Sequence, residues 1–321
     1  MANLTYTGDV IDDVLFRAGE PVDGTSDFNA AVLEYVNRAY RAIWMGGGEF
    51  VEDMNEPWLW LKKDPPAVLT IMPYIETGTI AVTNNSTSAT LSAAQALDLD
   101  GYFLKVDGHP DVFRVSAHTA AGTAVTLDGV YTGEDETAAT YRLMKLEYAL
   151  AADILRLIGP LRVQSDNESE IQGIDLSALD RDYPLLNLEA GTPDRFALVT
   201  ETKVRFNKCG GTSSTDLRRV EYDYLYKPSD LTDSGAEVPV VPREHLSVLS
   251  DIALFYLFQA KSDLRMEVIG VQARAGLKAM QKDNRARLAQ IGRHLGHLTP
   301  RPGRISQYNR VLRTTSGVII G

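Results

Sequence analysis

The chain has 321 residues, of which 44% are apolar and 23% are charged, and its formal net charge is −11. This length and composition are ordinary for a globular protein with one large domain or two small ones. The negative charge argues against a protein that wraps DNA, because such a protein needs a basic surface. We expect neither a signal peptide nor a membrane span, since the first residues lack a basic segment before an apolar run and no apolar stretch approaches roughly 18 residues.

The charge is unevenly distributed along the chain. No Asp or Glu follows Asp283, so the last 38 residues carry +7 and the rest carries −18. A basic end on an acidic body predicts that this end binds an acidic partner, with a solvated, unstructured tail as the alternative. The single cysteine, Cys209, excludes an intrachain disulfide and is expected to be a buried or loop thiol.

The first 50 residues predict a helical hairpin. Apolar residues recur at helical spacing over residues 8–18, where Asp9 can cap the start and Gly19 ends the helix. A second amphipathic stretch follows Asp27 and ends at the glycines of residues 46–48. We assign residues 1–65 to this hairpin and expect the clustered Trp58 and Trp60 to pack in the core or against another subunit.

Residues 66–146 predict an inserted β domain. Apolar and polar residues alternate there in short runs, which are separated by Asn84-Asn85, Asp107-Gly108, Gly122 and Asp128-Gly129. Five or six short antiparallel strands in about 80 residues indicate a small sandwich or barrel.

Helical spacing returns over residues 147–159, with Leu150, Ile154, Leu157 and Ile158 on one face. A β-hairpin around 196–227 follows, and Tyr222, Tyr224 and Tyr226 alternate on one face of its last strand as a subunit or packing surface. Two apolar stripes then predict long helices over 243–292, with a break near Ser262–Asp263 or at Gly270. The second stripe consists of Leu264, Val268, Val271, Ala275, Leu277 and Met280.

The expected fold class is therefore α+β. A helical bundle would be built from the N-terminal hairpin and the long C-terminal helices, with the β domain inserted in it. Residues 147–292 complete the helical body, and residues 293–321, which contain Gly, Pro and Arg without a clean helical period, form an extended basic arm.

Motifs that would indicate an enzyme are missing from the sequence. There is no phosphate-binding GxxxxGK[ST] loop, no dinucleotide-binding GxGxxG and no nucleophile elbow GxSxG. His294 and His297 lie three residues apart, but their segment offers no Cys, Asp or Glu as a third metal ligand. We expect no catalytic residue, no cofactor and no metal site.

The order of these segments and their short sequence patterns resemble the bacteriophage head-to-tail adaptor (connector) family over most of the chain. The resemblance lies in DVIDDVLFRAGEPVDG with FNAAVLEYVNRAYRAIW, in the WLW segment, in ATYRLMKLEYALAADILRL, and above all in GTPDRFALV with VEYDYLYKPSDLT and VPVVPREHLSVLSDIALFYLFQAKSD. The chain departs from that family's pattern where LAAD replaces an expected proline-containing turn, and in its long arginine-rich tail.

The resemblance implies a structural virion protein of the head–tail junction, assembled in the host cytoplasm. It implies a homo-oligomeric ring, commonly twelvefold, beneath the portal protein and above the next tail component, with double-stranded DNA passing through the lumen without specific binding. The C-terminal arm would dock on the portal. Its candidate contact residues are Arg301, Arg304, Ile305, Tyr308, Arg310, Val311, Leu312, Arg313, Val318, Ile319 and Ile320.

Two other functions remain open at this point. The first is a tail or baseplate component with a carbohydrate-binding β domain, suggested by Tyr74, Tyr102, Phe103, Phe113, Tyr131 and Tyr141. The second is a hydrolase of the cell envelope, which the lack of a coherent catalytic constellation argues against.

Overall fold

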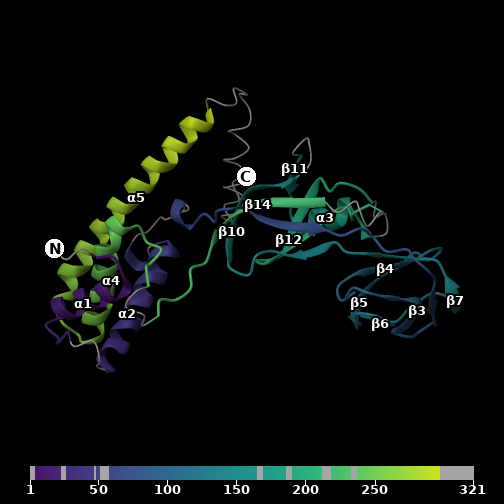
Figure 1. The fold of residues 1–321 in the computed structure, drawn as a ribbon, viewed down its shortest axis with the longest axis horizontal. Helices are drawn as coiled ribbons and strands as arrows, with labels where there is room; N and C mark the ends of the chain where they lie inside the picture. Colours follow the sequence, from purple (N-terminus) through teal and green to yellow (C-terminus); the bar gives the residue numbers. More distant parts are fainter. Residues whose placement is uncertain are drawn as a thin grey trace. The chain divides into compact units, whose positions relative to one another are not determined.

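The structure, a computed structural model, describes residues 4–22, 27–46, 48–50, 58–164, 169–185, 190–211, 218–232 and 237–296. The chain divides into two compact units (Figure 1). A helical unit combines Met1–Lys62 with Leu225–Gly321, and a β unit comprises Lys63–Tyr224. The predicted arm from residue 297 onward, with all of its candidate contact residues, lies outside the described residues.

The expected fold class is wrong. The protein is mostly β, with two nearly closed, barrel-like sheets of seven strands each, and it is not a helical bundle that carries one small inserted sandwich. The predicted insert accounts for only one of these sheets. The second sheet takes β1 from the start of the predicted insert and its other six strands from the residues that follow the insert, so its long-range pairing could not be read from local periodicity.

One sheet contains the strands that the alternating pattern predicted. Its order is β7-β2-β3-β6-β5-β4-β8, from Ile80–Val82 (β2), Ser88–Gln95 (β3), Phe103–Val106 (β4), Val112–His118 (β5), Gly122–Leu127 (β6), Glu136–Ala139 (β7) and Tyr141–Met144 (β8). The edge strands β7 and β8 are separated in sequence by Thr140 alone. The sheet must therefore curve until its two edges meet, and it encloses a core of aliphatic and aromatic side chains.

The other sheet has the order β1-β14-β10-β11-β12-β13-β9. Its strands are Ala67–Ile71 (β1), Glu147–Ala149 (β9), Ile154–Val163 (β10), Glu170–Gly173 (β11), Arg195–Thr200 (β12), Lys203–Phe206 (β13) and Arg218–Tyr226 (β14), and the helix α3 (Leu176–Asp182) lies between β11 and β12 in the chain. The two edges also approach each other, because the backbone N–H of Met72, just after β1, donates to the hydroxyl of Tyr148 in β9 at 2.9 Å.

The helix predicted over residues 147–159 is absent, and strands β9 and β10 occupy this region instead. A short apolar run fits a strand as well as a helix, and here distant partners decide between them. Tyr148 pairs with Val204 of β13, and Leu161 pairs with Ile171 of β11. The predicted hairpin around 196–227 is likewise only partly present, because β12 pairs with β13 whereas β14 pairs with β1 and β10.

In the helical unit, the first two predicted helices are confirmed as α1 (Thr7–Ala18) and α2 (Asp27–Trp44). The carboxylate of Asp9 accepts the backbone N–H groups of Thr5 and Tyr6 at 2.8 and 2.9 Å, which satisfies donors at the helix start. Gly19 ends α1 in the left-handed conformation, at φ 81°. Two short 3₁₀ turns follow α2, η1 (Gly48–Phe50) and η2 (Leu59–Leu61).

The long C-terminal helical stretch is broken once. A 3₁₀ turn, η4 (Arg243–His245), leads into α4 (Leu246–Ala260), and α5 (Met266–Gly296) follows. The break lies at one of the two predicted places, where Ser262 has a positive φ of 54°, while Gly270 is inside α5. The helix α5 includes the first four residues of the predicted arm. Among the described residues, no helix has both the length and the apolar character needed to span a membrane.

Candidate functional site

The helix α5 packs on α4 through small residues. A Cβ atom built on Gly276 would lie 2.9 Å from Cγ2 of Val248, and one built on Gly270 would lie 3.1 Å from the ring of Phe255. Glycine in the middle of a helix costs about 1 kcal/mol relative to alanine, so these positions favour close contact between the helices over helix propensity. The buried face of α5 continues through Ala273, Leu277, Met280 and Asn284.

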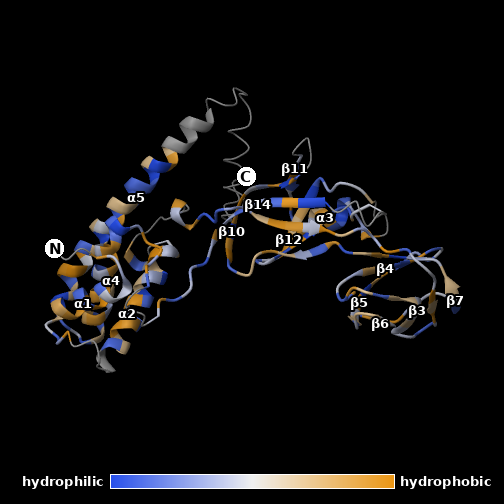
Figure 2. Ribbon diagram, viewed as in Figure 1, coloured by the Kyte–Doolittle hydropathy of each residue, from blue (hydrophilic) through white to orange (hydrophobic). Residues whose placement is uncertain are grey.

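The opposite face of α5 carries apolar side chains that the protein's own core does not use. Leu264, just before the helix, is 87% exposed, and Val268 and Val271 are 62% and 65% exposed. At 100° per residue, these positions fall on one line with three further exposed residues. We call this line the outward stripe; it consists of Leu264, Val268, Val271, Ala275, Lys278 and Lys282. Figure 2 shows apolar and hydrophilic segments alternating along α5.

The position of the outward stripe corrects the sequence-based assignment. Leu264, Val268, Val271 and Ala275 were expected to share one packed stripe with Leu277 and Met280. The structure separates these two groups onto opposite faces of α5. The signal that could have shown this is the pair of glycines six residues apart, because small residues in a long helix mark the face where another helix approaches closely.

The outward stripe changes character along its length, from apolar at its start to basic at its end. Lys278 and Lys282 are exposed, and Arg274 lies exposed beside them. Within the described part of the chain, these three cations make no ion pair. A surface that combines apolar side chains with unpaired cations suits an acidic partner that also offers an apolar contact.

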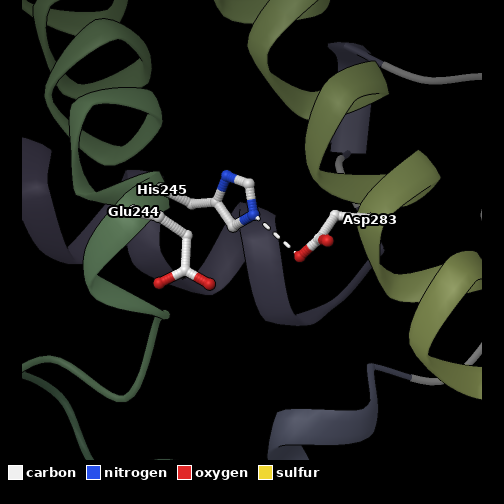
Figure 3. Close-up of side chains that lie close together, drawn as sticks. All are labelled: Glu244, His245 and Asp283. Atoms are coloured by element: carbon white, nitrogen blue, oxygen red, sulfur yellow. Dashed lines mark hydrogen bonds and ion pairs between the residues drawn. The ribbon is translucent and has the colours of Figure 1, made fainter.

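A polar cluster holds the C-terminal half of α5 to the start of α4 (Figure 3). Nε2 of His245 lies 3.4 Å from Oδ2 of Asp283, and Nε of Arg287 lies 3.0 Å from the same oxygen. Arg287 also forms an ion pair with Glu244. A hydrogen bond from its own backbone and the Arg287 guanidinium lower the pKa of Glu244.

The spacing in this cluster would allow a metal ion to bind. Glu244, His245 and Asp283 each offer one ligand atom, and these atoms lie within 4.8 Å of one another. The guanidinium of Arg287, however, already forms ion pairs with both carboxylates. A divalent cation would have to displace this residue before binding. The cluster is therefore better explained as an attachment between η4 and α5 than as a metal centre.

Trp58 and Trp60, which were expected to pack in the core or against another subunit, line a cavity of about 110 Å³ beside this cluster. Trp58 is buried, and its indole N–H donates to the carbonyl of Ile43 at 2.8 Å. Trp60 is half-buried, and the two rings lie 5.8 Å apart between centroids. The backbone N–H of Leu59, between them, donates to Oδ1 of Asn284 at 2.9 Å. Both tryptophans thus pack within the helical unit.

The predicted tyrosine row is divided between the units. Tyr222 and Tyr224 are buried in the β unit, while Tyr226 belongs to the helical unit and is half-buried. The hydroxyl of Tyr222 accepts the backbone N–H of Ala151, and the hydroxyl of Tyr224 donates to Asp153, both at 2.8 Å. The first two tyrosines therefore hold the β9–β10 connection and do not present an exposed surface.

The aromatic residues that suggested carbohydrate binding lie mainly in the interior of the β unit. Five of the six are buried, and Tyr74 is half-buried; the buried ones are Tyr102, Phe103, Phe113, Tyr131 and Tyr141. A sugar-stacking platform needs exposed ring faces, so these residues no longer support that alternative.

No family model matches this chain, and no curated protein is significantly similar to it in sequence. Support for a function therefore comes from the chain's own residues. The outward stripe of α5 is a feature of the described residues that the protein's own core does not use.

Proposed function

We propose that this chain is a structural virion subunit, a head-to-tail adaptor that assembles as a ring beneath the portal and connects the capsid to the tail. The observation that carries this proposal is the outward stripe of α5, a long helical face with exposed apolar residues followed by cations that make no ion pair with any residue the structure describes. Exposed valines and leucines aligned over several turns are typical of a surface that another protein covers.

The resemblance to adaptors supports the proposal through the helical unit alone. The resemblance implied a mainly helical body, and that expectation is wrong. Of the segments that carry it, those near the N-terminus form α1 and α2 and LSVLSDIALFYLFQA forms α4, whereas RFALV and VEYDYLY form strands β12 and β14. Both ends of the chain contribute: α1 and α2 come from the N-terminal part, and α4 and α5 from the C-terminal part.

The proposal also assigns a role to the chain's charge. A channel through which DNA passes should not retain it, and a net charge of −11 disfavours general binding to phosphates. The arginine-rich residues that follow α5 would then dock on acidic portal surface. Tyr308, Val311 and Ile319 are among their apolar anchors.

The experiment mixes the purified full chain with the portal protein of the same virion and images the mixture by electron microscopy. We expect a ring of stoichiometric occupancy, coaxial with the portal. Truncation after Gly296 keeps α5 whole and removes the basic arm, so it should weaken portal binding without unfolding the protein. If no ring forms and the truncation leaves portal binding unchanged, the proposal is wrong.

A further inference from the structure

A second exposed face in the helical unit complements the outward stripe. On α1, Asp9, Asp12 and Phe16 lie on one side of the helix, and the Phe16 side chain is 77% exposed. Asp12 makes no ion pair within the described part of the chain. Partial burial and the nearby Asp9 carboxylate raise the pKa of Asp12, as expected where negative charge gathers without a cation. We call these three residues the α1 face.

The two faces match in chemistry and spacing if the helices run antiparallel. The α1 face is acidic at its start and aromatic at its end, whereas the outward stripe is apolar at its start and basic at its end. Phe16 lies seven residues after Asp9, and Lys278 lies seven residues after Val271, which is about 10.5 Å along either helix. When Phe16 meets Val271, Asp9 therefore meets Lys278.

Contacts with α4 show the direction and height of α1 within one copy. Arg17 pairs with Asp251, and Glu20, just beyond α1, pairs with Lys261 at the end of α4. The helix α1 therefore runs in the same direction as α4, and its last turn lies beside residues 251–261.

The direction of α5 follows from its glycine contacts. Gly270 lies beside Phe255, and Gly276 lies beside Val248, so α5 runs opposite to α4. Phe255 lies near the middle of residues 251–261, the part of α4 that is beside the last turn of α1. Val271, which follows Gly270, is consequently at about the same height as Phe16.

Consider a ring whose axis is parallel to α4. It preserves both the directions of α1 and α5 and the equal heights of Phe16 and Val271. Rotation about that axis keeps each residue at its height and each helix in its direction. The α1 of the next copy then arrives antiparallel to α5, with Phe16 at the height of Val271. Because the two faces differ, the contact is head-to-tail, which is the kind that closes into rings.

We propose that the outward stripe of α5 in one copy packs antiparallel against the α1 face of the next copy. Phe16 would contact Val268 and Val271, and Asp9 and Asp12 would face Lys278 and Arg274. This inference rests on the proposed function, for which it supplies the contact between subunits.

Cysteine cross-linking in the full chain tests the contact. The native Cys209 is buried and should not form a cross-link. With the portal present and diamide as the oxidant, the double variant F16C/V271C should give a ladder of disulfide-linked multimers on a non-reducing gel. The single variants F16C and V271C should give none. A matched control, M45C/V271C, uses Met45, which is 70% exposed on the helical unit just after α2, and should also give no ladder.

A charge exchange provides an independent measurement. R274E should reduce the fraction of chain in rings at least tenfold, and D12R should do the same, because each places like charges opposite one another. The double variant D12R/R274E should restore rings. Circular dichroism checks that each variant folds.

The two proposals fail separately. Rings on the portal without a cysteine ladder would overturn this contact and leave the adaptor function intact. A ladder without portal-bound rings would support the contact and count against the adaptor. If the ladder is missing and K278E with K282E instead lowers affinity for duplex DNA, the stripe binds nucleic acid and the inference is wrong.

Discussion

Gly276 of α5 lies so close to Val248 of α4 that a Cβ atom at this glycine would come within 2.9 Å of a valine methyl group. Val248 is buried and β-branched, so it has little freedom to move away. This contact decides which face of α5 is covered, and it thereby leaves the outward stripe exposed.

The Gly276→Ala substitution tests that contact. Alanine would gain about 1 kcal/mol in helix propensity, but forcing a methyl group into a filled space costs typically 1–3 kcal/mol. We expect the free energy of unfolding to fall by about 1 kcal/mol in urea denaturation. A rise of about 1 kcal/mol would show that propensity dominates and that α4 and α5 are less tightly packed.

The two faces of α5 should respond differently to substitution. Leu277 is fully buried, so Leu277→Ala should lower the free energy of unfolding by about 2–5 kcal/mol. Val271→Asp, on the outward stripe, should change it by no more than about 0.5 kcal/mol. Thermal and urea unfolding of the isolated protein measure both values. Equal losses in the two variants would mean that the outward stripe is part of the core.

The sequence predicted these helices better than it predicted the way they pack. Caps such as Asp9 and Gly19 act within a few residues, so the bounds of α1 could be read locally. The covered face of α5 could not, because apolar periodicity favours Val268 and Val271 over Gly270 and Ala273. Close approach to α4 reverses that preference, and it depends on Phe255 and Val248, which precede the two glycines by 15 and 28 residues.

The β unit shows the same limit. Alternating residues and turn signals such as Asn85, with its φ of 58°, marked the strands of the first sheet. Residues 147–159 have apolar spacing that suits a helix, and only pairing with β11, β13 and β14 shows that they form strands. The portal-docking residues of the predicted arm lie outside the described residues, so the proposal for them still depends on the sequence.

Removing Arg287 should convert the polar cluster into a metal site. In Arg287→Ala, the carboxylates of Glu244 and Asp283 lose their cation and lie beside His245, a set of donors that suits Zn²⁺. Zinc should then raise the melting temperature of the variant and leave that of the unchanged protein as it was. An equal rise in both proteins would show that Arg287 does not occupy the place of the metal.

Tyr224 should contribute to a loss of stability at high pH. Burial, with the hydrogen bond it donates to Asp153 and the charge of that carboxylate, raises its pKa from 10.0 to about 12. The folded protein therefore holds this proton more tightly than the unfolded chain does. The resulting stability is fully present below pH 10 and is lost as the pH rises toward 12. Tyr224→Phe should flatten the fall in unfolding free energy between pH 10 and pH 12. An unchanged slope would contradict this assignment.

The most direct test of the central claim is electron microscopy of the full chain mixed with its portal, comparing the unchanged protein with Val271→Asp. The unchanged protein should form a ring on the portal. The variant should remain folded but form no ring, because an aspartate in the outward stripe places a charge in an apolar contact. Rings of the same occupancy in the folded variant would contradict the claim that the outward stripe joins neighbouring subunits.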